Sequence, residues 1–368
     1  MRILFITPTG VDGAFGSSMR TVYIRDTLME IGEVHTVLYQ GGSDDSRDRE
    51  WRPGMIREAR YSRSGFSPIA LRQHAGTRKW IGELIQQYEY DVIVVRYLST
   101  ATVIPGHARR LVIADADDAI KTLPPGGGAS AKQHAVLLAR NFLTLIMARL
   151  VGHLWYVSPL DGRRLPGRSK SLLRNVIRFP DDGRPRPAAI RGRIVMVGLM
   201  SHEPNRHGLR WFVAQVLPAL RELAPGVELH VIGAHDPAFA LEFASDDVIV
   251  RGFVSDLTVE YDKATLIIAP IFFGGGTQIK VIDALAHGRP LVASTFAHAG
   301  FADDLHDRQH LLVAEKREEW VDSCASILLG PEAADPMARC GHRAVAAYDC
   351  RNMLTPIRET IDTLVNRQ

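Results

Sequence analysis

The sequence predicts an α/β protein in which two Rossmann-like domains are each built on a doubly wound parallel sheet. The chain has 368 residues, which is enough for about two domains of ordinary size. In both halves, short apolar segments alternate with helical segments, a pattern typical of parallel sheets covered on both faces. Glycines follow several of the apolar segments, at the strand ends where open α/β sheets bind ligands.

The first half of the chain contains five predicted strands. The first, at residues 2–7, leads through a glycine-rich loop at residues 10–16 into a helix expected at residues 17–31. The other four strands are expected at residues 35–39, 91–95, 111–114 and 153–158. Because helical segments lie between them, these strands are expected to be parallel.

The second half repeats this organisation. It begins with a strand at residues 193–197 that ends at Gly198, and a single helix is expected at residues 205–223. Further strands are expected at residues 228–232, 248–250, 265–269 and 291–293. We therefore divide the chain into an N-terminal domain (1–178), a linker (179–192), a C-terminal domain (193–350) and a C-terminal helical segment (351–368) expected to pack back on the N-terminal domain.

Composition excludes several classes of protein. The chain is 46% hydrophobic and 23% charged, as in globular proteins with full-sized cores. Its net charge of +3 does not argue for nucleic-acid binding, which usually needs a marked basic excess. The three cysteines, Cys324, Cys340 and Cys350, have no CxxC spacing, which favours a reducing cytoplasmic compartment.

Two segments bear on membranes. The apolar stretch at residues 141–157 carries Arg149 and His153, so we interpret it as a buried helix running into a strand and not as a membrane span, which needs about 20 apolar residues. Residues 162–193 are rich in arginine. They are expected to be a solvated connector, or to contact either an anionic acceptor or anionic lipid, the latter as a peripheral contact at the inner face of the plasma membrane.

The strongest local signal lies at residues 270–290. Three glycines, Gly274, Gly275 and Gly276, follow a strand and leave bare backbone open to a ligand. Thr277 is expected to cap the next helix, whose free N–H groups would form an anion site. Lys280 lies one turn later and could neutralise a diphosphate, and Asp283 could accept hydrogen bonds from ribose hydroxyls. This pattern indicates a nucleotide site.

The segment GGGTQIKVIDALAHGRPLVAS resembles the donor-site signature of retaining glycosyltransferases with the GT-B fold, family 4 and its relatives (glycosyl transferases group 1). Other landmarks follow in the family's order: Val197-Gly198 with Pro204-Asn205, Ile232-Gly233, Arg251-Gly252-Phe253-Val254 with Asp256, Tyr261 with Ala264, and, in the first half, Val157-Ser158 with Asp161. The resemblance implies two domains facing a central cleft. It also implies transfer of a sugar from a nucleoside-diphosphate sugar to an acceptor hydroxyl, with retention.

The resemblance also implies roles for particular residues. Lys280 and Asp283 are the catalytic candidates. The donor-binding candidates are Gly13, Gly16, Gly198, Gly252, Phe253, Val254, Gly274, Gly275, Gly276, Thr277 and Gln278. The implied acceptor is a glycan, a polysaccharide or a lipid-linked molecule, contacted by the N-terminal domain through Arg20, Arg96, Asp115 and Asp118. No metal and no cofactor is expected, because helix N-termini and Lys280 could stabilise the leaving diphosphate.

Departures from the family pattern leave alternatives open. Gly275 stands where the family often has a glutamate, Asp283 is shorter than the usual second glutamate, and Gln278 replaces a basic residue. A non-catalytic relative that binds a nucleotide or a partner protein is one alternative. An epimerase of the same fold is another, with His202, His207 and His287 as its nearest acid–base candidates.

A third alternative rests on the segment that ends in Asp115, Ala116 and Asp117. It resembles the metal-binding motif of GT-A glycosyltransferases, in which paired carboxylates hold a divalent cation.

Overall fold

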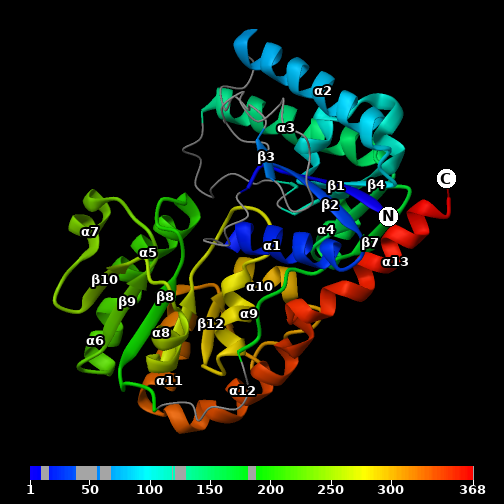
Figure 1. Ribbon diagram of the computed structural model, residues 1–368. Coiled ribbons are helices and arrows are strands. Elements are labelled where there is room, and N and C mark those ends of the chain that lie inside the picture. The colour runs from blue at the N-terminus through cyan, green and yellow to red at the C-terminus, as the bar shows by residue number, and fades with distance from the viewer. Residues whose placement is uncertain are drawn as a thin grey trace. The chain divides into compact units, whose positions relative to one another are not determined.

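A computed structural model describes residues 1–9, 16–38, 56–58, 68–117, 119–120, 130–180 and 188–367. The chain divides into two compact units, each treated separately below. Unit 1 contains residues 1–121, 130–176 and 350–368, and unit 2 contains residues 122–129 and 177–349. Each unit has a parallel sheet with helices on its faces (Figure 1), which confirms the predicted α/β class and the two doubly wound sheets.

The sheet of unit 1 has the strand order β3-β2-β1-β4-β5-β6-β7, and every described pairing in it is parallel. The strands are β1 (Arg2–Thr7), β2 (Glu33–Leu38), β3 (Ile56–Glu58), β4 (Val92–Arg96), β5 (Val112–Asp115), β6 (His153–Tyr156) and β7 (Lys170–Leu172). The order reverses between β1 and β4, and that topological switch point is where such sheets bind ligands.

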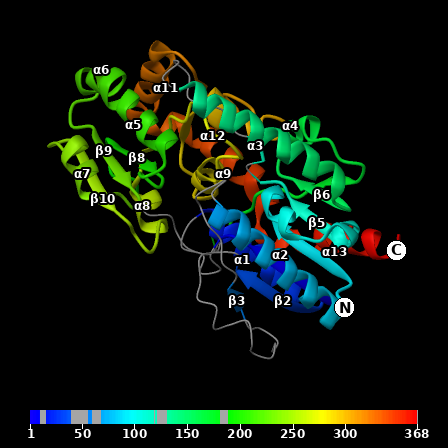
Figure 2. The same ribbon diagram turned by 90° about the horizontal axis from the view of Figure 1, so that it is seen from above.

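Helices cover both faces of this sheet (Figure 2). They are α1 (Gly16–Met29), α2 (Pro68–Tyr88), α3 (Ala131–Leu150), α4 (Pro159–Arg164) and α13 (Leu354–Val365), with 3-10 segments η2 (Leu98–Val103), η3 (Gly106–Leu111) and η6 (Cys350–Met353). One face packs against α1 and α13, and the other against α2, α3 and η2.

The C-terminal helix α13 is part of unit 1. It buries Ile357, Ile361 and Leu364, a helical spacing that gives one apolar face, and it lies beside α1. The indole nitrogen of Trp155 on β6 donates a hydrogen bond to the Thr360 hydroxyl at 3.1 Å. The last residues of the chain therefore complete the core of unit 1.

Helix α3 corrects one prediction. We expected residues 141–157 to begin with a buried helix, but α3 buries only Thr144, Met147 and Ala148 and leaves Phe142, Ile146 and Leu150 exposed. The prediction was wrong because apolar content does not show how many faces of a helix are covered. Among the described residues, no helix is long and apolar enough to cross a bilayer.

Unit 2 has the same strand order with one strand fewer described. Its sheet runs β10-β9-β8-β11-β12-β13, all parallel, so the switch point lies between β8 and β11. The strands are β8 (Arg193–Val197), β9 (Glu228–Ile232), β10 (Val248–Gly252), β11 (Leu266–Ala269), β12 (Leu291–Ser294) and β13 (Leu312–Ala314). The helices are α5 (Glu203–Gln215), α6 (Leu217–Leu223), α7 (Pro237–Phe243), α8 (Thr258–Lys263), α9 (Ile279–Ala286), α10 (Thr295–His298), α11 (Arg317–Leu329) and α12 (Pro331–Ala344), with 3-10 segments η4 (Ala299–Phe301) and η5 (Val345–Tyr348).

The helix predicted at residues 205–223 is two helices, α5 and α6, which meet at Val216. Pro218 lies in the first turn of α6, where its missing N–H group leaves no hydrogen bond broken. A proline at that position inside one continuous helix would remove a hydrogen bond and clash with the preceding turn. The break between α5 and α6 therefore has a local cause, the proline at position 218.

Helix α5 packs very closely on the end of β11. A Cβ atom added at Gly208, in the middle of α5, would overlap the carbonyl oxygen of Pro270. This contact brings the N-terminal turn of α5 next to the glycine-rich loop that follows Pro270. Gly208 therefore helps to set the geometry of the switch point.

We expect Gly208→Ala to lower the free energy of unfolding of unit 2 by about 1–3 kcal/mol, because the helix must move away from β11. Gly76→Ala on α2 is the matched control. A Cβ there meets no atom within 4 Å, and alanine in a helix interior is favoured over glycine by about 0.5–1 kcal/mol. Hydrogen exchange of individual peptides should show weaker protection in unit 2 for Gly208→Ala and equal or stronger protection in unit 1 for Gly76→Ala. Equal stability of the Gly208 variant and the parent protein would contradict the close contact.

Candidate functional site

The residues after β8 and β11 meet at the switch point of unit 2. Gly198 follows β8, and a Cβ atom on it would lie 2.8 Å from the side-chain nitrogen of Asn205. Asn205 is buried in the first turn of α5, and its amide donates to the carbonyl oxygen of Leu199 at 2.8 Å. Gly198 is therefore needed for Asn205 to lie against the strand end.

Lys280 reaches this position from α9. Its ammonium group donates to the Oδ1 atom of Asn205 at 2.5 Å, joining the helices that follow β8 and β11. Burial lowers the pKa of Lys280 to about 7, because a desolvated ammonium group is disfavoured. A half-buried lysine at two helix N-termini is suited to bind an anion, which would restore its charge.

The glycine-rich loop adopts backbone angles that require glycine. The φ angle is 133° at Gly274 and 66° at Gly276. The helix that follows begins at Ile279 with Gln278 as its N-cap, so the prediction that Thr277 caps it is wrong. The methyl group of Thr277 instead packs against Gly300, where an added Cβ would lie 2.5 Å away.

Asp283 lies one turn after Lys280 on α9 and is half-buried. Burial raises the pKa of its carboxyl group to about 6, and the nearby Tyr261 hydroxyl acts in the opposite direction. The Tyr261 ring stacks on His287, with 4.7 Å between ring centroids. Asp283 is thus a partly desolvated acceptor whose surroundings are fixed by buried aromatic rings.

The predicted base-binding segment begins at the last residue of β10, at the same edge of the sheet. Gly252 has a φ angle of 72°, and the Phe253 side chain after it is 61% exposed. Val254 is half-buried against the core. An aromatic ring exposed at a strand end offers an apolar face to a flat ligand group.

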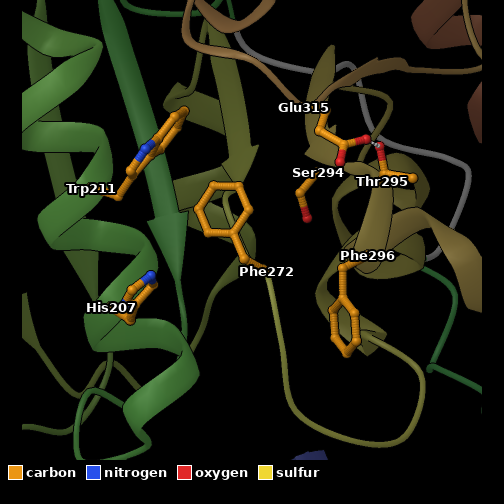
Figure 3. Close-up of a pocket in the computed structure, with 7 residues that line it drawn as sticks. All are labelled: His207, Trp211, Phe272, Ser294, Thr295, Phe296 and Glu315. Carbon is orange, nitrogen blue, oxygen red and sulfur yellow. Dashed lines mark hydrogen bonds between the residues drawn. The ribbon is translucent and has the colours of Figure 1, made fainter. Parts of the chain in front are cut away.

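Unit 2 also contains an aromatic cavity beside the glycine-rich loop (Figure 3), and sequence reasoning did not find it. It has a volume of about 410 Å³ and is lined by His207, Trp211, Phe272, Ser294, Thr295, Phe296 and Glu315. The Trp211 and Phe272 rings meet edge to face, with 4.8 Å between centroids, and Thr295 donates to Glu315 at 3.0 Å. The cavity shares no residue with the predicted donor set. Its seven lining residues are spread between positions 207 and 315, so only the fold shows that they lie together.

The predicted acceptor residues of unit 1 form a buried charge network at the carboxyl edge of its sheet. Arg20 on α1 donates to both carboxylate oxygens of Asp115, at 2.7 and 3.1 Å. Arg96 at the end of β4 contacts the same carboxylate and donates to Asp117 at 3.3 Å. Arg20, Arg96 and Asp115 have no exposed surface, so they are not accessible to an acceptor in this structure.

Further contacts fix the network. The Arg20 guanidinium also donates to the carbonyl oxygens of Leu173 and Arg174, and Arg96 donates to the Thr21 hydroxyl at 3.1 Å. Burial lowers the pKa of Arg20 to about 10, a cost that the neighbouring acids partly offset. After Arg96 the backbone of Tyr97 has a φ angle of 61°, which is strained for a residue other than glycine.

Other predicted residues are placed as follows. Gly16 is the first residue of α1, after β1. Gly13 and Asp118 lie outside the described residues. The predicted linker is described only at residues 179–180 and 188–192, and Phe179 packs in the core of unit 2.

Residues 191–329 match the family model described as Glycosyl transferases group 1. The matched residues all lie in unit 2. No curated protein matches the sequence of the chain.

Solved structures resemble the whole chain. Sucrose-phosphate synthase from Thermosynechococcus elongatus has a TM-score of 0.76 at 15% identity over 100% of both chains. A glycosyltransferase from Rickettsia africae has a TM-score of 0.68 at 14% identity over 100% of this chain and 99% of that one. The Anabaena protein HepE in complex with UDP-glucose has a TM-score of 0.68 at 15% identity over 99% of this chain and 100% of that one. These likenesses confirm the GT-B fold.

The GT-B fold corrects the GT-A alternative. Asp115 is the last residue of β5 in a doubly wound unit, Asp117 lies two residues after it, and both carboxylates contact Arg96. The positive charge of two arginines disfavours a divalent cation at the same oxygens. The resemblance of this segment to a metal motif was therefore misleading.

Unit 2 also contains a site residue that sequence reasoning overlooked. Asn205 was noted only as part of a landmark, yet it is the hydrogen-bond partner of Lys280. Its position in the first turn of the helix after β8 was the available signal, because such turns face the ligand edge of the sheet.

Proposed function

We propose that the protein is a glycosyltransferase that moves a sugar from a nucleoside-diphosphate sugar to an acceptor hydroxyl. The observation that carries the proposal is the Lys280–Asn205 contact at the switch point of a glycosyl transferases group 1 domain. It places a desolvated ammonium group beside two helix N-termini, where a diphosphate would gain most from it.

In this proposal each part of the site binds one part of the donor. Lys280, the N-terminal turn of α5 and the loop Gly274–Gln278 surround the diphosphate, Asp283 accepts hydrogen bonds from the ribose, and Phe253 covers the base. The complex of HepE with UDP-glucose supports a uridine nucleotide as the first ligand to test.

The chemical step in this proposal depends on electrostatics. When the bond from the anomeric carbon to the diphosphate breaks, negative charge grows on the leaving oxygen. In this proposal Lys280 and the helix N–H groups contact that oxygen, so they stabilise the transition state more than the ground state. We further propose that the reaction retains the anomeric configuration, as in family 4, that it needs no resident metal or cofactor, and that the acceptor is a glycan or a lipid-linked molecule.

A nucleotide screen tests the proposal. One nucleoside diphosphate among UDP, GDP, ADP and TDP should raise the melting temperature in EDTA, and a ligand at about 100 times its dissociation constant stabilises by roughly 2.7 kcal/mol. The matching nucleotide-sugar should then release the diphosphate and form a new glycosidic bond, detected by mass spectrometry.

Each of the other outcomes favours a different function or mechanism for this protein. Binding without turnover of any sugar donor would favour a non-catalytic relative, which the glycine at position 275 makes a real alternative. Conversion of the sugar without release of the diphosphate would favour an epimerase. A shift that appears only with Mg²⁺ or Mn²⁺ would contradict the metal-free mechanism.

A further inference from the structure

Helix α3 exposes a continuous apolar stripe that the proposed transfer reaction does not use. Of the 15 large apolar side chains exposed among the described residues, six lie on this helix: Val136, Leu138, Phe142, Leu143, Ile146 and Leu150. Leu138 and Phe142 are 69% and 65% exposed. Exposed apolar surface gathered on one element, and not scattered singly, indicates an interaction surface.

The spacing of these residues gives the stripe its shape. Leu138, Phe142, Ile146 and Leu150 follow one another at four-residue steps, so they form one row along the outer face of the helix. In the last two turns the opposite face, with Thr144, Met147 and Ala148, is buried in unit 1, whereas residues 131–143 are exposed or half-buried on every side. The helix therefore packs on unit 1 through its C-terminal turns and presents a row of apolar side chains, about three turns long, on its outer side.

The charged side chains of α3 itself are all positive. Lys132, Arg140 and Arg149 are exposed on α3, and the helix contains no aspartate or glutamate. With about 100° of rotation per residue, Arg149 projects within the row and Lys132 along its edge, whereas Arg140 projects to another side of the helix. The 3-10 segment η2, which packs against α3, has no acidic residue either.

We propose that this face of α3 binds the surface of an anionic lipid bilayer. An apolar row with an arginine within it and a lysine at its edge matches that surface, because the apolar side chains can enter the acyl region while the cations stay among anionic headgroups. A second copy of the chain fits less well, since pairing two such faces brings like charges together without an acid to separate them. The proposal goes beyond the transfer reaction, and it assigns membrane contact to residues 131–150 and not to the basic segment 162–193.

Vesicle flotation tests the proposal with the full chain. The protein should float with phosphatidylcholine vesicles that contain one third phosphatidylglycerol, and binding to pure phosphatidylcholine should be at least tenfold weaker. The double variant Phe142→Asp with Ile146→Asp should lose at least tenfold in partitioning. The matched control is Leu241→Asp with Leu329→Asp, two exposed apolar residues of unit 2, which should bind as the parent does.

A second measurement reports insertion directly. Tryptophan introduced as Phe142→Trp should shift its emission to the blue with anionic vesicles and be quenched by brominated acyl chains, whereas Leu241→Trp should show neither change. The thermal shift caused by the nucleotide should be the same in the double variant and the parent, so a failed membrane experiment would leave the donor-site proposal intact.

Three results would overturn the inference. The first is that the parent does not float with anionic vesicles. The second is equal flotation of the parent and the double variant. The third is a dimer that forms without vesicle binding and is broken by the same double variant, which would assign the α3 face to a second copy.

Discussion

Replacing Asp115 by alanine is expected to lower the free energy of unfolding of unit 1 by about 3–5 kcal/mol. The carboxylate receives two hydrogen bonds from Arg20 and contacts Arg96, and neither guanidinium group has any exposed surface. Without the carboxylate, two buried cations would face each other and lose the acid that both of them contact. Breaking a buried ion pair on one side costs more than the pair contributes, because the remaining charge stays desolvated.

Hydrogen exchange of individual peptides is the measurement that fits a two-unit protein, for which one overall free energy is not well defined. The strands β1, β4 and β5 should lose protection in Asp115→Ala, while the strands of unit 2 keep theirs. Asp335→Ala is the control, since that exposed carboxylate pairs with Arg339 one turn away and should change stability by less than about 1 kcal/mol. Unchanged protection in unit 1 would show that Arg20 and Arg96 find other partners.

The charge network shows which features of unit 1 could be predicted from the sequence and which could not. Arg20, Arg96 and Asp115 could be placed near the carboxyl edge of the first sheet, because each lies at the end of a predicted strand or in the first turns of the next helix. Their pairing could not be predicted, since Arg20 and Asp115 are 95 residues apart and only the strand order brings them together. As a result, three residues that we expected to bind the acceptor instead form a buried charge network in this structure.

The donor site, too, could be predicted only in part from the sequence. The strand at residues 193–197 and the glycine-rich loop could be read locally, because strand periodicity and positive φ angles leave a signal within a few residues. The Lys280–Asn205 hydrogen bond spans 75 residues, and its geometry depends on the close packing of Gly208 on Pro270. The cavity around Trp211 and the exposed face of α3 likewise depend on which helix faces are covered, and no local pattern records that.

Lys280→Ala is expected to weaken binding of the nucleotide-sugar by about 10–150-fold, which corresponds to the roughly 1.5–3 kcal/mol of a hydrogen bond to a charged group. The loss should be larger in kcat/KM than in affinity, because charge on the diphosphate grows as the sugar leaves. Lys316→Ala, which removes an exposed lysine of the same unit, should change neither value. Calorimetry and initial rates measure both. Equal affinity of Lys280→Ala and the parent would remove Lys280 from the donor site.

The pH dependence of binding gives an independent test of the same residue. In the free protein the pKa of Lys280 is about 7, and a bound diphosphate must raise it because the anion stabilises the charged ammonium group. Binding therefore takes up a proton above pH 7, and affinity should fall by up to about tenfold per pH unit there.

Asp283 is expected to cause the loss of donor affinity on the acidic side of the pH profile. The pKa of its carboxyl group is about 6, so protonation at lower pH removes an acceptor for the ribose and affinity should fall again. Affinity should therefore be highest between about pH 6 and pH 7. A nucleotide-sugar is the right probe, because its diphosphate does not titrate in this range. Lys280→Arg should remove only the alkaline limb, since arginine stays charged, and Asp283→Asn only the acidic one. An alkaline limb that persists in Lys280→Arg would mean that another group near the diphosphate titrates, and the charge that holds the donor would then have to come from elsewhere in unit 2.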